Sequence, residues 1–332
     1  MEETVVIITT GGTISMRKVD WMHVNLSRKV PIANVEGIAS LAKIEQIEFS
    51  NIPSPYMTPD LMWDLSLLVR KQIDRSSVKG VVISHGTDTL EETSYFLDLT
   101  VQTNKPVVLT AAMRNINELG TDGPRNIFSS VKVAASPKAR EVGVVVCLND
   151  EIHAAREVTK TYTSNVATFE SPGYGPLGIV DEDGVFFFRR SLTRTSYRPG
   201  RIESNVPLIK TFTGDQGFFF NSAMENGCKG IVLEGFGRGN VPPSILPALD
   251  RIIQMGIAVV LVSRCYKGRV LDIYSYEGGG ADLKERGVIL GHETSAQKAR
   301  IKLMVLLGMN LSVQQIRREF EMSDYSPKRR DQ

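Results

Sequence analysis

The stretch VVISHGTDTLEET, residues 81–93, contains the change from strand to helix that decides the fold. Its apolar residues run without alternation up to Ser84, which is typical of a strand buried on both faces of a parallel sheet. Five small or polar residues follow, and a helical pattern begins after them. These polar residues have two interpretations: Thr87 or Asp88 caps the helix, or the group binds a ligand at the end of the strand.

The same alternation of short apolar runs and helical patterns extends through the first half of the chain. Residues 58–75 carry Leu61, Leu65, Leu68 and Val69 on one face, with Thr58 placed to cap the helix and Pro59 suited to its first position. Such alternation predicts a doubly wound α/β sheet. The predicted strands are 4–9, 44–49, 80–84, 106–110 and 142–148, and the predicted helices are 58–75 and 89–101.

The pattern changes near residue 178. Residues 178–190 predict a β-hairpin around Asp183-Gly184. The next segment, 191–207, has little periodicity and two prolines, so it is interpreted as a linker between domains. We therefore expect a larger N-terminal α/β catalytic domain at 1–190, the linker at 191–207 and a smaller C-terminal α/β domain at 208–332.

Strand and helix patterns alternate again after the linker. The last helix opens with Ser312 and Gln315 in the spacing of a capping box. The predicted strands here are 230–236 and 257–263, and the predicted helices are 242–256, 295–308 and 312–322.

Length and charge limit the class of protein. A chain of 332 residues suits two domains of ordinary size, and a hydrophobic content of 42% lets each bury a core. The 39 basic and 37 acidic side chains leave a net charge of +2. We therefore expect neither nucleic acid nor a membrane surface as a partner.

Cysteine and histidine usage indicates the compartment and the cofactors. The three cysteines, Cys147, Cys228 and Cys265, are scattered along the chain and form a poor disulfide framework. No secretory signal precedes the first strand. The four histidines show no metal-ligand spacing. We expect a cytoplasmic protein without a metal ion.

A second polar strand end lies near the N-terminus, in TTGGTIS, residues 9–15. Its two consecutive glycines allow backbone N–H groups to approach a ligand closely. In an open α/β sheet the carboxyl ends of the strands face the ligand crevice. If the two strands are neighbours, Thr13 and Thr87 face the same crevice. A threonine hydroxyl becomes a nucleophile when a base takes its proton, although Thr13 could equally be a turn residue that bonds its own backbone.

A third segment, residues 156–178, places Lys160 among small and hydroxyl residues. A solvated surface lysine is the ordinary interpretation. A lysine held near Asp88 could instead form a buried relay with Thr87. Burial would lower its pKa and the aspartate would raise it.

Coenzyme and phosphate signatures are missing. GYGPLG, residues 173–178, fits the letters of a dinucleotide fingerprint, but it leads into the predicted hairpin and not into a helix. The chain has neither a Walker A motif nor the GxSxG of serine hydrolases.

Taken together, TTGGTI and SHGTDTL resemble the two signatures of the bacterial-type L-asparaginase family of amidohydrolases. The blocks VTKT, VATF and GYGPLG, with TAAMR and DGPRN, extend the resemblance over nearly the whole chain. It implies the two-domain α/β fold expected above. It also implies that the protein needs no metal or coenzyme and forms homotetramers with sites between the subunits of a dimer.

The resemblance also implies residue roles. Thr13 is the expected nucleophile, and Thr87, Asp88 and Lys160 form a supporting triad. Asp88 holds the α-ammonium group of the substrate and Ser54 the α-carboxylate. The expected substrate-binding residues are Gly12, Ser54, Gly86, Thr87, Asp88, Asn240 and Glu277, the last two reaching a site in the neighbouring subunit.

Two departures from the family pattern affect these roles. The segment from Ile14 to Pro53 contains no tyrosine, although the family uses a tyrosine there to assist the nucleophile. Trp21, His23 and Tyr56 are the candidates to cover the site. Segment 15–31 is interpreted as a lid. After Ser54 the chain has Pro55 and Tyr56 where family members carry a polar pair, so one ammonium contact is expected to be lost.

These observations predict hydrolysis of L-asparagine to L-aspartate and ammonia, through a threonine nucleophile and a covalent acyl-enzyme. One alternative is glutaminase-type activity, since asparagine and glutamine differ by one methylene. Another is the ammonia-supplying subunit of a tRNA-dependent amidotransferase, which is disfavoured because the first signature starts within ten residues of Met1. A third is a non-catalytic amino-acid sensor, which the missing tyrosine would suit.

Overall fold

The computed structural model describes residues 3–18, 24–26, 35–192, 194–292 and 294–321. The chain divides into two compact units, residues 1–197 and 198–332, and each is described by itself. Within the described ranges no helix is long and apolar enough to cross a membrane.

The N-terminal unit is built on one mixed sheet with the order β12-β11-β8-β7-β6-β5-β1-β4. Five neighbouring strands are parallel, and the other three continue the sheet in antiparallel pairing. The parallel strands are β4 (Lys43–Ile52), β1 (Thr4–Gly11), β5 (Val78–Ser84), β6 (Val107–Thr110) and β7 (Val144–Leu148). The others are β8 (Glu151–Ala154), β11 (Gly178–Val180) and β12 (Val185–Phe187).

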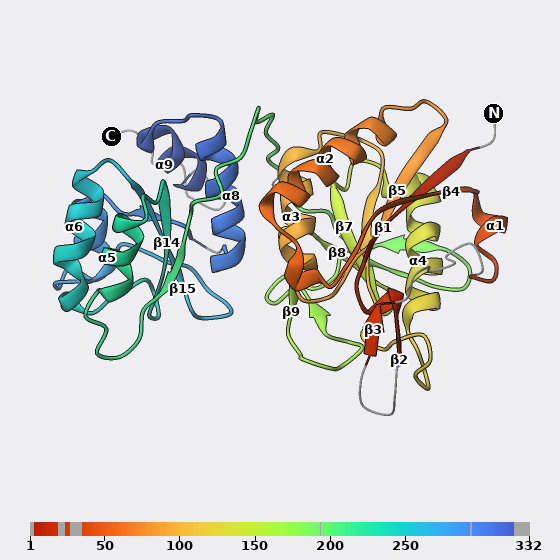
Figure 1. Cartoon of the computed structure of the whole chain (residues 1–332), viewed down its shortest axis with the longest axis horizontal. Helices are drawn as coiled ribbons and strands as arrows, with labels where there is room; N and C mark the ends of the chain where they lie inside the picture. Colours follow the sequence, from red (N-terminus) through yellow and green to blue (C-terminus); the bar gives the residue numbers. More distant parts are fainter. Residues whose placement is uncertain (1–2, 19–23, 27–34, 193, 293, 322–332) are drawn as a thin grey trace. The chain divides into compact units, whose positions relative to one another are not determined.

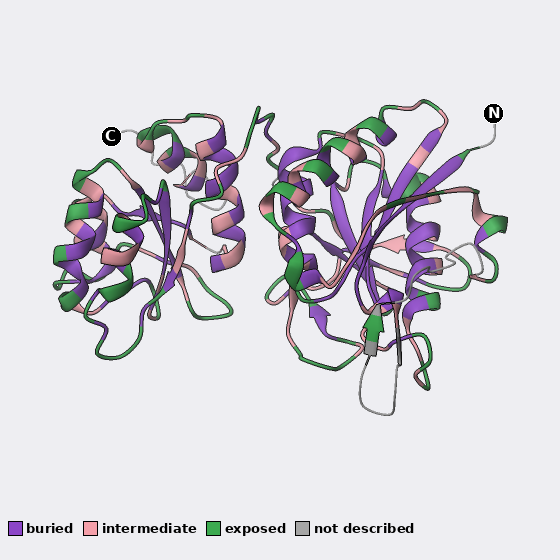
Figure 2. Cartoon of the chain, in the orientation of Figure 1, coloured by how far each residue is buried: buried purple, intermediate pink, exposed green. Residues whose placement is uncertain are grey.

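Helices cover both faces of this sheet, as Figure 1 shows. On one face Val6 and Ile8 of β1 pack with α2 (Pro59–Ile73) and α3 (Leu90–Thr100). On the other face Val5 and Ile7 pack with α4 (Gly123–Ala135), beside the short α1 (Ile38–Leu41). Because successive side chains of a strand point to opposite faces, an uninterrupted apolar run fills both cores. Figure 2 shows the resulting buried sheet.

The predicted elements of this unit are confirmed with small shifts at their ends. Thr58 caps α2, since its Oγ1 accepts a hydrogen bond of 3.2 Å from the amide of Leu61. The predicted strand 44–49 lies within β4, and its alternating pattern reflects its place at the sheet edge. The hairpin at 178–190 forms as β11 and β12. Helix α4 and strand β8 were not predicted.

The N-terminal unit also contains two small two-stranded sheets. Strand β2 (Met16–Lys18) pairs antiparallel with β3 (Val24–Leu26), and β9 (Thr159–Lys160) pairs antiparallel with β10 (Phe169–Glu170). The predicted lid, 15–31, contributes β2 and β3, and the rest of it beyond Ser15 lies outside the described residues.

The C-terminal unit is a four-stranded parallel sheet with the order β13-β14-β15-β16. The predicted helix 242–256 begins late: Pro243–Ile245 form a 3-10 turn before α6 (Leu246–Gln254). The predicted capping box is confirmed, because the Ser312 amide donates to Gln315 Oε1 and the Gln315 amide donates to Ser312 Oγ. The remaining elements are β13 (Leu208–Lys210), β14 (Gly230–Gly235), β15 (Ala258–Ser263), β16 (Ile289–Leu290), α5 (Phe218–Glu225), α7 (Gly280–Arg286), α8 (Ala296–Gly308) and α9 (Val313–Glu321).

The expected fold class, a larger doubly wound N-terminal α/β domain with a smaller C-terminal α/β domain, is confirmed. What matters for function is the carboxyl edge of the larger sheet, where the parallel strands end in the polar segments identified above.

Candidate active site

Three loops leave the same edge of the N-terminal sheet. Strand β1 lies between β4 and β5, with Thr9 opposite Ser84 and Gly11 opposite Ile52. Parallel strands with these registers end at the same level. The loops that carry Thr13, Ser54 and Thr87 therefore begin side by side at the carboxyl edge, where open α/β folds bind ligands.

Glycines allow two of these loops to touch. A Cβ atom at Gly12 would lie 2.4 Å from the Cα of Gly86 and 2.5 Å from its nitrogen. Gly12 has φ of 82° and ψ of −177°, a backbone region that is essentially restricted to glycine. Thr13, half-buried, follows directly in the 3-10 turn η1 (Thr13–Ser15). The Gly12–Gly86 contact thus ties the first signature to the second.

Ser54 joins the third loop to this pair. It begins the 3-10 turn η3 (Ser54–Tyr56) and is 5% exposed. Its Oγ accepts a hydrogen bond of 3.2 Å from the Asp88 amide, and its carbonyl accepts one of 2.8 Å from Thr89 Oγ1. Since the hydroxyl acts as an acceptor toward Asp88, its proton remains able to bind an anion.

Helix α3, which follows the second signature, is not capped by Thr87 or Asp88 as one interpretation of this segment predicted. Thr89 is the N-cap of α3, and its hydroxyl bonds to Ser54 instead of to the helix. The interpretation that Thr87 or Asp88 caps the helix is therefore wrong. Both side chains are turned to another partner, Lys160.

Lys160 connects with both residues across the fold. Its Nζ donates to Thr87 Oγ1 at 2.9 Å and to Asp88 Oδ1 at 2.7 Å. The side chain of Lys160 is 15% exposed, whereas that of Asp88 is 60% exposed. The ammonium group is thus largely shielded, and the carboxylate beside it reaches solvent. The interpretation of Lys160 as a solvated surface lysine does not fit this geometry.

A small hairpin carries Lys160, and its anchors were not recognised in the sequence. Phe169 lies opposite Lys160 in the β9–β10 pair and is buried in the same core as Val158. Thr168 closes the hairpin by donating from Oγ1 to the Tyr162 carbonyl and accepting from the Tyr162 amide. Two-residue strands give no periodic signal, so only the apolar Phe169 within a polar segment pointed to this anchor.

His85, between the end of β5 and Gly86, is a further residue to which the sequence assigned no role. Its ring is fully buried. Nδ1 lies 2.8 Å from the Gly86 carbonyl oxygen, and Nε2 lies 3.1 Å from Thr93 Oγ1. Burial lowers the pKa of His85 to about 4, so the ring is neutral near pH 7. Because a carbonyl only accepts, Nδ1 carries the proton and the Thr93 hydroxyl donates to Nε2.

Asn240 and Glu277 belong to the C-terminal unit and are not among the residues joined by these contacts. Their two loops are neighbours within that unit, because the Val241 amide donates to the Gly278 carbonyl at 2.8 Å. Glu277 is exposed. Asn240 is half-buried, and its Oδ1 is buried without a hydrogen-bond partner among the described residues.

Of the three candidates to cover the site, Trp21 and His23 lie outside the described residues. Tyr56 ends the turn that Ser54 begins, and it is 69% exposed. Of the three candidates, Tyr56 is thus the one that the structure describes.

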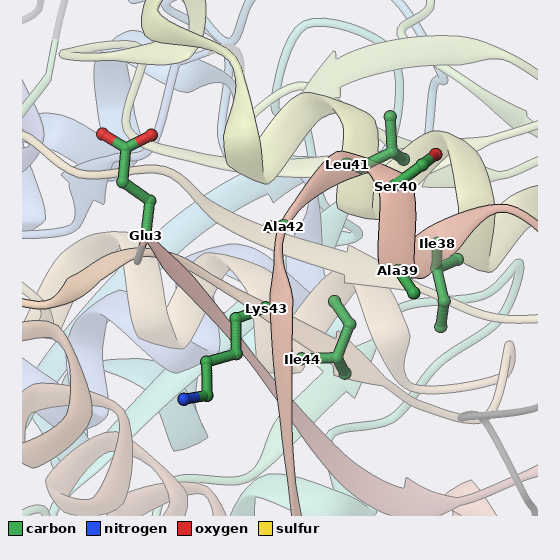
Figure 3. Close-up of a pocket in the computed structure, with 8 residues that line it drawn as sticks. All are labelled: Glu3, Ile38, Ala39, Ser40, Leu41, Ala42, Lys43 and Ile44. Atoms are coloured by element: carbon green, nitrogen blue, oxygen red, sulfur yellow. The ribbon is translucent and has the colours of Figure 1, made fainter. Parts of the chain in front are cut away.

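A separate hollow lies at the opposite edge of the sheet. It is lined by Glu3 and residues 38–44, at the amino ends of β1 and β4 (Figure 3). The side chains drawn there are mostly aliphatic, with Glu3, Ser40 and Lys43 as the polar members. This hollow is remote from the strand ends that carry Thr13 and Thr87, so it is not part of the candidate active site. Within the described ranges, no cluster of three or more His, Cys, Asp or Glu side chains could hold a metal ion.

An ammonium group, a carboxylate and several hydroxyls converge at the carboxyl edge of a parallel sheet. This arrangement defines the class of protein as an α/β enzyme, with groups suited to nucleophilic chemistry on a small polar substrate.

Comparison with known proteins identifies the family. The profile described as "Asparaginase, N-terminal" matches residues 4–193, and "Glutaminase/Asparaginase C-terminal domain" matches residues 205–320. An L-asparaginase of Bacillus licheniformis is 36% identical over 315 residues, which cover 92% of this chain and 96% of the relative. A probable L-asparaginase of Deinococcus radiodurans is 37% identical over 320 residues, which cover 95% of this chain and 96% of the relative.

A solved structure agrees with these sequence matches. The crystal structure of a probable cytoplasmic L-asparaginase from Campylobacter jejuni superimposes with a TM-score of 0.87 at 32% identity. The match covers 96% of this chain and 99% of that structure. The chain belongs to the asparaginase family of amidohydrolases, as its two signatures indicated.

Proposed function

We propose that this protein hydrolyses the side-chain amide of free L-asparagine to give L-aspartate and ammonia. The observation that carries the proposal is the pair of hydrogen bonds from Lys160 to Thr87 and Asp88, at the sheet edge where Gly12 holds the Thr13 loop against Gly86. The family membership and the L-asparaginase names of the relatives support the choice of substrate.

The proposed reaction has two steps. Thr13 Oγ attacks the amide carbon, its proton passes to the departing nitrogen, and ammonia leaves an ester between Thr13 and the aspartyl group. Water then attacks the ester carbon, gives one proton back to Thr13 Oγ, and releases aspartate. Thr87, backed by Lys160 and Asp88, assists proton transfer, because a hydroxyl that accepts a hydrogen bond from an ammonium is free to donate its own proton.

The α-ammonium and α-carboxylate groups of the substrate are assigned to residues beside the Thr87–Lys160 pair. Asp88 uses Oδ1 for Lys160 and is well exposed, so its other oxygen suits the α-ammonium group. The Ser54 hydroxyl suits the α-carboxylate, together with backbone amides around Gly12 and Gly86. The Asp88 carboxylate and the hydrogen-bond donors around Ser54 would then lie on opposite sides of the substrate's α-carbon, as the two charged groups of a free amino acid require.

The remaining expectations also belong to the proposal. Asn240 and Glu277, on neighbouring loops of the C-terminal unit, would complete a site of another subunit in a dimer or homotetramer. The buried Asn240 Oδ1 without a partner among the described residues is consistent with a ligand or partner contact. We also propose a catalytic domain at 1–190, a linker at 191–207 and a C-terminal domain at 208–332. The proposed location is the cytoplasm.

Ammonia release from L-asparagine by the purified protein tests the activity, with L-glutamine as the parallel substrate. Thr13→Val is nearly isosteric and lacks the hydroxyl, so kcat should fall by about 10³-fold or more, whereas Thr13→Ser keeps a nucleophile and should keep measurable turnover. Circular dichroism would check that both variants fold. Wild-type rates in Thr13→Val would rule out Thr13 as the nucleophile.

Lys160→Met keeps the length of the side chain and removes its charge and donors. We expect kcat to fall by about 10²- to 10⁴-fold, the range of general acid–base groups. Calorimetry with asparagine separates enzyme from sensor, because binding without any ammonia release would favour a non-catalytic sensor.

A further inference from the structure

His85 fixes the orientation of one peptide group in the candidate active site. Its Nδ1–H donates to the Gly86 carbonyl, which belongs to the peptide unit joining Gly86 to Thr87. In a planar trans peptide the C=O and N–H bonds point in opposite directions. With the Gly86 oxygen held by the buried ring, the N–H of Thr87 must point away from that ring.

The ring is itself held in place from its other side. Thr93, a fully buried residue of α3, donates its hydroxyl proton to Nε2. The ring therefore bridges a rigid helix and the signature loop, and only the neutral tautomer with the proton on Nδ1 satisfies both partners. Gly86 is also packed tightly, since a Cβ atom there would lie 2.6 Å from Ser54 Oγ.

The Thr87 amide is well placed to act on a ligand. In the part of the chain that the structure describes, it donates no hydrogen bond to a protein atom, whereas the next amide, of Asp88, donates to Ser54 Oγ. Thr87 is itself only 6% exposed. A buried N–H without a protein partner is rare in folded proteins and calls for a ligand or water.

We propose that His85 is a positioning residue: it holds the Gly86–Thr87 peptide so that the Thr87 N–H donates to the substrate's amide oxygen as negative charge develops there. The inference rests on the proposed function. A backbone donor aimed at a developing oxyanion acts mainly in the transition state, so its loss lowers kcat more than it raises KM.

Three substitutions of His85 separate the contribution of each ring nitrogen. His85→Asn can place an N–H near the position of Nδ1, whereas His85→Gln places its amide nearer to Nε2. His85→Phe keeps a ring and removes both hydrogen bonds. Thr93→Val, a matched control, removes the contact to Nε2 and leaves the bond to Gly86.

The expected result is a graded loss in steady-state assays with asparagine. His85→Phe and His85→Gln should lower kcat by about 10²-fold with KM within about threefold, since one oxyanion donor is worth about 10²–10³ in kcat. His85→Asn should keep kcat within about fivefold of wild type, and Thr93→Val within about threefold. Equal losses in His85→Asn and His85→Gln, full activity in His85→Phe, or a loss confined to KM would overturn the proposal.

Two readouts do not depend on turnover, so they separate failure of this inference from failure of the proposed function. Nitrogen-15 NMR of the His85 imidazole in the wild-type protein should show the neutral ring with its proton on Nδ1 at pH 7. Crystal structures should show the Gly86–Thr87 peptide rotated in His85→Gln and unrotated in His85→Asn. A proton on Nε2, or an unrotated peptide in His85→Gln, would contradict the positioning role, whatever substrate the enzyme uses.

Discussion

The buried neutral His85 should make the N-terminal unit less stable as the pH falls. Burial lowers the pKa of this ring from 6.5 to about 4. Between these values the unfolded chain binds a proton that the folded chain does not. The free energy of unfolding therefore decreases as the pH falls from 6.5 toward 4, and the contribution is fully retained above pH 6.5.

The size of the effect follows from the two pKa values. Each pH unit inside the window changes the free energy of unfolding by about 1.4 kcal/mol, so 1.5 units below pH 6.5 correspond to about 2 kcal/mol at pH 5. This figure depends little on the folded-state pKa as long as that pKa lies clearly below 5. The full difference, reached near pH 4, is about 3 kcal/mol.

Urea unfolding of wild type and His85→Asn at pH 7.5 and pH 5 measures this difference. The tryptophans, Trp21 and Trp63, both precede residue 197, so their fluorescence reports on the N-terminal unit. Wild type should lose about 2 kcal/mol more than His85→Asn between the two pH values. Burial and the neighbouring Glu170 raise the pKa of Glu151, which acts in the opposite direction but cancels between the two proteins. Equal pH dependence in both would refute the reasoning.

Four further substitutions test backbone strain, helix capping and core packing in the N-terminal unit by urea unfolding. Gly12→Ala should destabilise the protein by about 3 kcal/mol or more, because the new Cβ atom would clash with the Gly86 backbone and the φ angle is unfavourable for alanine. Gly173 also has a positive φ, of 88°, but it has open space around it, so Gly173→Ala should cost only about 1–2 kcal/mol. Equal costs would show that the loop contact is unimportant. Thr58→Ala removes the cap of α2 and should cost about 1 kcal/mol; no change would mean that water replaces the cap. Ile83→Ala, fully buried in β5, should cost about 3 kcal/mol, and a loss below 1 kcal/mol would mean that the core collapses into the space.

Much of the site could be predicted because its parts are local. The TTGGT and SHGTDT segments follow apolar strands, and the carboxyl ends of neighbouring parallel strands must meet at one edge. Thr13 and Thr87 were therefore expected on loops at this edge, and the strand order places these loops there, beside the loop of Ser54, which the family resemblance alone had indicated. The role of each side chain in catalysis stays a prediction until the variants are measured.

Other features could not be derived from local patterns, because they depend on contacts between distant parts of the chain, and only the family resemblance pointed to Lys160 as a partner of Thr87 and Asp88. Lys160 meets Thr87 across 73 residues, and the hairpin that brings it there is made of two-residue strands with no periodic pattern. The local sequence around Asp88 favoured a helix cap, but in the folded protein the Asp88 carboxylate accepts a hydrogen bond from Lys160 instead. Likewise His85 has an ordinary position in the sequence and becomes neutral only through burial.

The sequence by itself determined the alternation of strands and helices, the cap of α2 by Thr58 and the family signatures, because hydrophobic periodicity and capping act within a few residues. Only the tertiary structure decided at which distances and through which hydrogen bonds the polar groups of the site meet. Strand order and the glycine contact between Gly12 and Gly86 set those distances, and electrostatic interactions and desolvation depend on distance in space and not on separation along the chain.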